Sequence, residues 1–184
     1  QKNSLHSFAH ADGCYHLMGC ILSAASCNKW WVENIIGSKD YDIVLGGISE
    51  LGDNPVTFLP YLMGERSPHN NPNARGMFIG MSMDTTQTQM SQAVLEGVAF
   101  AIRDSFEIAK SQGIQIERTK LCGGGAKSRI WRKIIANVLG IKVDILKTEE
   151  GPGLGAAMLA AVACGEYASV QEAADKLVKV VKTI

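Results

Sequence analysis

The sequence predicts an α/β fold, in which helices pack in layers against a sheet that is at least partly parallel. Three observations predict this class. The chain has 184 residues, of which 46% are hydrophobic and 20% charged, and this suits a single globular domain. Helical and strand-like patterns alternate through its last third. Within that third, a short strand runs into Gly123-Gly124-Gly125 directly before a helix.

The first half of the chain reads as short strands and amphipathic helices. Asp12-Gly13 is a common hairpin signal and joins two strands, and Gly37 ends the first helix. Thr85 and Thr86 are candidates to cap a long helix. The elements expected here are strands within 4–20, helices over 21–36 and 41–51, a strand at 55–62, a polar loop at 64–73, a strand at 76–82 and a helix to about 111.

The second half alternates more regularly, and glycines mark its boundaries. Gly140 ends one predicted helix and Gly165 another. The expected elements are a strand ending at 120–122, a helix over 127–139, a β-branched strand at 141–146, an alanine-rich helix over 151–164 and a final amphipathic helix over 170–181.

Charge and cysteine content exclude several classes of function. Eighteen basic and eighteen acidic residues leave no net charge, so the chain lacks the broad positive field that nucleic acid or an anionic membrane attracts. No apolar run approaches the roughly 18 to 20 residues of a membrane span. Five cysteines without a CxxC pair indicate reduced thiols and a cytoplasmic protein.

Because a strand begins within a few residues of Gln1 and no initiator Met precedes it, we expect a fragment of a longer chain.

A strand followed by Gly-Gly-Gly-Ala-Lys-Ser and a helix fits a nucleotide site. Glycine lets a base or phosphate approach the backbone closely, and the helix N-terminus favours an anion. The alternative is a tight turn without a ligand. The segment does not match a Walker A loop, because Ala126 stands where that pattern requires glycine before the lysine.

Three other groups of residues leave alternatives open. Gly151 to Ala156 satisfies GxGxxA, and a dinucleotide-binding oxidoreductase therefore stays a rival, although Glu149 and Glu150 would repel a pyrophosphate. His6, His10 and His16 lie close together without a carboxylate or thiolate to complete a metal site, and polar packing or substrate contact is favoured. Charged loop residues form either a polar clamp or a solvated surface: Glu65, Arg66 and His69.

Several motifs in the right order resemble the FGGY carbohydrate kinases, in particular their xylulokinase branch. They are Phe58 to Pro72, which includes Gly-Glu-Arg-Ser-Pro-His-Asn-Asn-Pro; Gly76 to Glu96, which matches the second family signature; Leu121 to Ser128, which resembles the adenosine motif; and Gly151 to Ala157, which resembles a hinge motif. The resemblance covers about residues 6 to 167.

The resemblance implies a ribonuclease-H-like fold of the actin, Hsp70 and sugar-kinase superfamily, a mixed sheet flanked by helices. It implies that residues 1–184 form one C-terminal domain of a longer two-domain enzyme. The N-terminal domain of that enzyme, which is the partner of this one, would supply the catalytic base and the Asp-x-Gly-Thr phosphate motif. The implied reaction transfers phosphate from ATP, with Mg²⁺, to a ketose such as D-xylulose. This chain alone is then expected to be inactive, and its apolar hinge surface makes a homodimer possible. Glycerol, gluconate and ribulose kinases of the same family are alternatives.

By the same resemblance, Gly124, Gly125 and Ala126 would lie against adenine and ribose, and Gly123 would shape the turn. Lys127 and Ser128 would stand near the sugar–phosphate end of the nucleotide. Arg129 takes a position where some relatives have Asn, so it either reaches phosphate or faces solvent. The loop that contains Glu65, Arg66 and His69 would border the cleft between the two domains.

Overall fold

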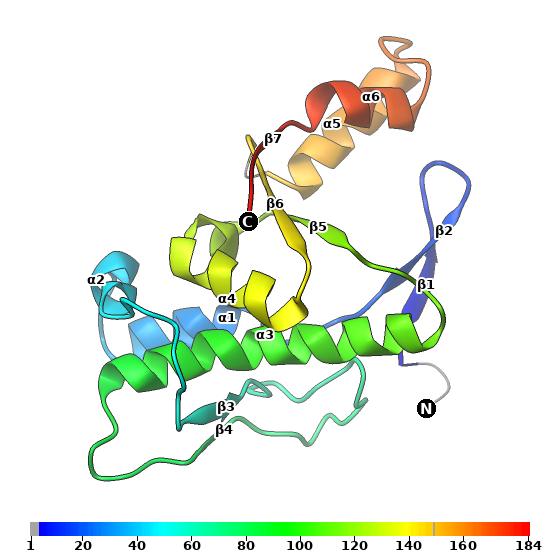
Figure 1. Cartoon of the computed structure of the whole chain (residues 1–184). Coiled ribbons are helices and arrows are strands. Elements are labelled where there is room, and N and C mark those ends of the chain that lie inside the picture. Colours follow the sequence, from blue (N-terminus) through cyan, green and yellow to red (C-terminus); the bar gives the residue numbers. More distant parts are fainter. Residues whose placement is uncertain (1–3, 149) are drawn as a thin grey trace.

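A computed structural model of the protein describes residues 4–148 and 150–184 (Figure 1). The long helix α3 (Gln87–Ser111) crosses the middle of the molecule. On one side it packs against the hairpin of β3 (Thr57–Leu59) and β4 (Met77–Ile79), and on the other against α4 (Arg129–Leu139). The α3 helix is therefore the central layer of the domain.

Local side-chain signals account for the start of α3. The Thr86 hydroxyl accepts the backbone N–H of Gln89, and the Gln89 side chain accepts the N–H of Thr86. This reciprocal capping box satisfies two N–H groups that a helix end leaves unpaired. Val94, Leu95 and Val98 then face the core and are at most 1% exposed.

The main sheet has the order β5–β6–β7 and is mixed. Strand β5 (Arg118–Leu121) pairs in parallel with β6 (Lys142–Leu146), and β6 pairs antiparallel with β7 (Val180–Thr183). Helix α4 connects β5 to β6, as a parallel pair requires. The α/β class with a partly parallel sheet is thereby confirmed.

The predicted final helix over 170–181 is wrong at its C-terminal end. Helix α6 (Val170–Leu177) stops at Leu177, and residues 180–183 form β7 at the edge of the sheet. The run after Leu177 is rich in β-branched valine, which favours a strand when a partner is present. The buried Asp144 of β6 supports the pairing of β6 with β7, because its Oδ1 accepts a hydrogen bond from the Thr183 hydroxyl at 2.6 Å.

The first predicted hairpin is confirmed, whereas the helices after it are shorter than expected. Strands β1 (His6–Ala9) and β2 (Tyr15–Met18) pair antiparallel, and Gly13 between them has φ 85°. The helix predicted over 21–36 begins only at Ala25, as α1 (Ala25–Lys29), and continues as the π-helix η1 (Trp30–Ile35). Helix α2 (Tyr41–Gly46) is also shorter than the 41–51 expected.

The helix pair near the C-terminus lies away from the α3 core (Figure 1). Helix α5 (Pro152–Ala163) packs against α6, and Met158 is its buried residue. Proline suits the first turn of a helix because backbone N–H groups there have no acceptor within the helix, so the lack of an N–H in proline costs no hydrogen bond. Among the described residues, no helix is long and apolar enough to cross a membrane.

Candidate nucleotide site

The triple-glycine segment forms a tight turn between β5 and α4. Gly123 has φ 85°, a left-handed conformation that favours glycine. The next residues form one 3-10 turn, η2 (Gly124–Lys127). Ser128 then begins α4, since its hydroxyl accepts the N–H of Trp131 at 3.3 Å. The structure thus confirms a strand, a glycine turn and a capped helix in the predicted order.

Gly124 and Gly125 differ in the space around the position where a larger residue would have its Cβ. A Cβ on Gly125 would lie 2.8 Å from the Trp131 ring, which is closer than real contacts allow. A Cβ on Gly124 would meet nothing within 4 Å among the described residues. Gly125 is therefore required by packing, whereas Gly124 leaves its space open to a ligand.

The Trp131 side chain packs against Gly125 of this turn. Its ring is 4% exposed, and its indole N–H donates to the backbone carbonyl of Leu95 at 3.1 Å. Leu95 is fully buried in α3. The glycine turn is consequently anchored through Trp131 to the central helix of the domain.

A cavity of about 780 Å³ lies between the glycine turn and the helices α1 and α2. Small-molecule sites in proteins commonly have volumes of about 300 to 1,000 Å³. The cavity is lined from three separate parts of the chain by Ala25, Ser26, Asn28, Lys29, Tyr41, Asp42, Leu45, Gly124, Gly125, Lys127, Ser128 and Trp131. Sequence reasoning missed the contribution of α1 and α2, because these residues carry no motif and precede the glycines by about 80 to 100 positions.

Of the predicted site residues, Gly124, Gly125, Lys127 and Ser128 line this cavity. The Ala126 side chain is instead buried, at 9% exposure, inside the 3-10 turn. Arg129 lines an adjoining hollow of about 540 Å³, in which Lys127 and Ser128 also take part. The predicted residues therefore divide between the larger cavity, its neighbour and the core.

The surroundings of the helix N-terminus are mainly basic. Lys127, Arg129 and Lys133 line the smaller hollow, and Asp42 of α2 is the acidic residue in the same described lining. The N-terminal end of α4 adds the partial positive charge of its free N–H groups. Together these groups favour an anionic ligand such as a phosphate.

The Glu65 carboxylate, expected near the cleft between two domains, is buried among residues of this chain. Glu65 is 2% exposed, and its Oε1 accepts the N–H of Arg66 at 2.7 Å. Its Oε2 has no partner among the residues that the structure describes. Burial raises the pKa of the Glu65 carboxyl, and the surrounding backbone N–H groups only partly oppose this effect. Glu65 thus supports the loop from inside.

The other two predicted loop residues lie on the surface. The His69 Nε2 atom is 3.5 Å from Asp104 Oδ2 of α3 and 3.2 Å from the Tyr61 hydroxyl. Arg66 is exposed, with its guanidinium 3.9 Å from Cys20 Sγ. Glu65, Arg66 and His69 are absent from the described lining of the glycine cavity, so the structure does not bring the two predicted groups together.

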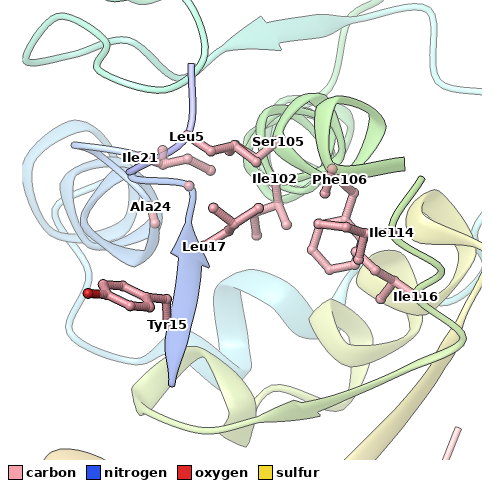
Figure 2. A pocket seen from close by; sticks show the side chains of 12 residues that line it. Leu5, Tyr15, Leu17, Ile21, Ala24, Ile102, Ser105, Phe106, Ile114 and Ile116 are labelled. Atoms are coloured by element: carbon pink, nitrogen blue, oxygen red, sulfur yellow. The ribbon is translucent and has the colours of Figure 1, made fainter. Parts of the chain in front are cut away.

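A second cavity, of about 590 Å³, differs in chemistry (Figure 2). It lies between the β1–β2 hairpin, α3 and the segment before β5, and apolar side chains such as Leu17, Ile102 and Phe106 point into it. The side chains described in its lining carry no charge. This surface does not suit a phosphate.

The N-terminal histidines and the GxGxxA segment are absent from the described lining of the cavity beside the glycine turn. Within residues 4–148 and 150–184, no three His, Cys, Asp or Glu side chains gather as metal ligands. A dinucleotide fold would continue from Gly151–Ala156 into another parallel strand. Here α5 leads into α6 and the antiparallel β7. Glu150 Oε2 would lie 3.0 Å from a Cβ on Gly153, and Glu149 lies outside the described residues.

Comparisons with known proteins identify the family to which the chain is similar. The model of the FGGY family of carbohydrate kinases, C-terminal domain, matches residues 3–164. The xylulose kinase of Escherichia coli K12 is 38% identical over 180 residues, which is 96% of this chain and 37% of that protein.

Solved structures give the same result. A xyloylose kinase from Brucella ovis superposes with a TM-score of 0.87 at 35% identity, over 100% of this chain and 38% of that one. A gluconate kinase from Lactobacillus acidophilus superposes with a TM-score of 0.80 at 25% identity, over 98% and 37%. The chain therefore spans a little over a third of the length of these relatives.

Proposed function

The chain belongs to the FGGY family of carbohydrate kinases, as their C-terminal domain, and from this premise we propose that it forms the nucleotide-binding wall of an ATP-dependent sugar kinase. The observation that carries the proposal is the open cavity beside Gly124, at the N-terminus of α4. The base and ribose would lie between the glycine turn and α1 and α2. Bound ATP would supply the phosphoryl group for transfer.

In this proposal each residue of the turn has a distinct part. Gly123 sets the direction of the chain, Gly124 leaves room for the nucleoside, and Gly125 admits the Trp131 ring. Ala126 acts from the core by holding the 3-10 turn. Lys127, Ser128 and Arg129 would attract the phosphates by charge and hydrogen bonding.

The proposed acceptor is a ketose, most specifically D-xylulose, which would become xylulose 5-phosphate. The identity to the xylulose kinase of E. coli favours this substrate over gluconate, for which the similar kinase is 25% identical. Glycerol and ribulose are further alternatives within the family. The base that deprotonates the sugar hydroxyl would come from an N-terminal domain in the rest of the protein, so this chain alone would not catalyse transfer.

We place the loop at 64–73 beside the cleft between the two domains. Its exposed Arg66 and His69 are available to a substrate or to the other domain, whereas the buried Glu65 holds the loop in place. The described residues do not provide a group of three metal-ligating side chains, and in this proposal Mg²⁺ would be held with residues of the rest of the protein.

We also propose a cytoplasmic location, which the five free cysteines support, because thiols stay reduced in that compartment. A homodimer stays a prediction, and light scattering on the purified protein would detect it.

The direct test measures ADP release by the full-length protein with D-xylulose, D-ribulose, gluconate and glycerol as acceptors. The proposal expects the highest kcat/KM for D-xylulose and no turnover by residues 1–184 alone. A large preference for glycerol or gluconate would overturn the proposed substrate, and a lack of ADP release with every acceptor would overturn the proposed reaction.

A further inference from the structure

The first helix of the domain, α1, begins without a capping side chain of its own. Ala24 is at its N-cap position and makes no side-chain hydrogen bond, and its first turn carries no acidic residue. The backbone N–H groups at the start of a helix have no acceptor within the helix. The start of α1 is therefore stabilised by groups from another part of the chain.

The Glu65 carboxylate, which is 2% exposed, lies beside this helix start. Burial raises the pKa of the Cys27 thiol of α1 to about 12, and the charge of Glu65 adds to this rise. Burial also raises the pKa of the Glu65 carboxyl, and the backbone N–H of Leu22 is among the groups that oppose this rise. Such interactions weaken with distance, so both effects indicate a carboxylate next to the turn that leads into α1.

Hydrogen bonds hold the loop that carries Glu65 against the same turn. The backbone N–H of Ser67 donates to the carbonyl of Cys20 at 3.0 Å. The Cys27 thiol donates to the carbonyl of Pro60, which precedes the loop, at 3.3 Å. Ser67 and Cys27 are both buried, at 1% and 0% exposure. The loop and the start of α1 are therefore joined by backbone contacts as well as by the buried charge.

Helix α1 forms one wall of the cavity beside the glycine turn, through Ala25, Ser26, Asn28 and Lys29. We infer that Glu65 is a positioning residue, which holds the start of α1 in place and thereby increases the affinity of the cavity for a nucleotide; this inference rests on the proposed function. Glu65 is absent from the described lining of the cavity, so it acts through α1 and does not touch the nucleotide.

The test compares Glu65→Gln and Glu65→Leu with the parent full-length protein. Glutamine keeps the shape and one acceptor oxygen but removes the charge, whereas leucine removes every acceptor. Asp144→Asn is the matched control, because Asp144 is also a buried carboxylate, at 1% exposure, and lies in β6 outside the described lining of the cavity. We expect ADP affinity, measured by titration calorimetry, to fall roughly three- to tenfold in Glu65→Gln, further in Glu65→Leu and not in Asp144→Asn.

Two further measurements separate positioning of α1 from a general change in stability. Hydrogen–deuterium exchange without nucleotide should be faster over residues 22–29 in Glu65→Gln and unchanged there in Asp144→Asn, whatever change in overall stability urea denaturation measures. In steady-state kinetics the KM for ATP should rise in Glu65→Gln while kcat changes little, which is the pattern of lost binding and not of lost chemistry. If Glu65→Leu does not fold, Glu65→Gln decides alone.

The outcomes that contradict the inference are distinct from failure of the proposed function. Unchanged exchange over residues 22–29, or unchanged ADP affinity, in Glu65→Gln overturns the role of Glu65 and leaves the nucleotide site in place. An equal loss of ADP affinity in Asp144→Asn also overturns it, because the loss then follows from replacing any buried carboxylate. Failure of the parent protein to bind ADP overturns the proposed function itself, and the exchange measurement then still decides whether Glu65 holds α1.

Discussion

Trp131 of α4 donates its indole N–H to the backbone carbonyl of Leu95 on α3, at 3.1 Å. This bond joins the helix that follows the glycine turn to the central helix of the core. It also fixes the ring that fills the space left by Gly125. The hydrogen bond therefore helps to hold this wall of the cavity against the central helix.

Trp131→Phe should test this role of the hydrogen bond. The substitution keeps an aromatic ring but removes the donor and leaves a small void. We expect the free energy of unfolding to fall by about 1–3 kcal/mol, as measured by urea denaturation, together with weaker ADP binding. Trp30→Phe is the control, since the Trp30 side chain has no hydrogen-bond partner among the described residues. Equal losses in the two variants would contradict a special role for the bond to Leu95.

Gly125→Ala should destabilise the protein because its Cβ would lie 2.8 Å from the Trp131 ring. The ring is held by Leu95 and cannot move away freely. We expect a loss of about 1–3 kcal/mol in the free energy of unfolding, measured by urea denaturation. Combining this change with Trp131→Phe should give less than the sum of the two losses. Strict additivity would show that the two residues do not act on each other.

Thr183→Val should weaken the edge of the main sheet. The Thr183 hydroxyl donates to the buried Asp144 carboxylate, which also lies 3.3 Å from Arg118 Nε. Valine has a similar shape and keeps the strand preference of β7, but it leaves the carboxylate with one partner fewer. We expect a loss of about 1.5–3 kcal/mol, as for a hydrogen bond to a charged group. A variant as stable as the parent would contradict this role of β7.

Glu65→Gln should change how stability depends on pH. Burial raises the pKa of the folded-state carboxyl above its ordinary value of 4.5, so the folded state holds the proton more tightly than the unfolded state. Stability from this group is therefore present below pH 4.5 and is lost as pH rises through the folded-state pKa. The stability of the parent relative to Glu65→Gln should fall across that window and be constant above it. Parallel curves from denaturation at a series of pH values would contradict this.

Local signals predict much of the fold. The capping residues Thr86 and Ser128 and the turn glycines Gly13 and Gly123 act within a few residues of themselves, and they lie where the sequence indicates. The order of β5, the glycine turn and α4 follows from the same kind of signal.

Features that depend on distant partners escape this reasoning. Valines after Leu177 continue a helical pattern, and only pairing with β6 makes them a strand. Glu65 reads as a surface charge until the packing around its loop is known. The contribution of Asn28 and α2 to the cavity likewise depends on how three separate segments meet.

The most direct test of the central claim is ADP titration of the full-length protein with Gly124→Leu. Gly124 has no left-handed φ, and its missing Cβ faces open space among the described residues, so the substitution should leave the melting temperature unchanged while filling the cavity. The account predicts at least about a tenfold loss of ADP affinity, a difference of roughly 1.4 kcal/mol. Unchanged ADP affinity in a folded Gly124→Leu variant would show that the nucleotide binds elsewhere.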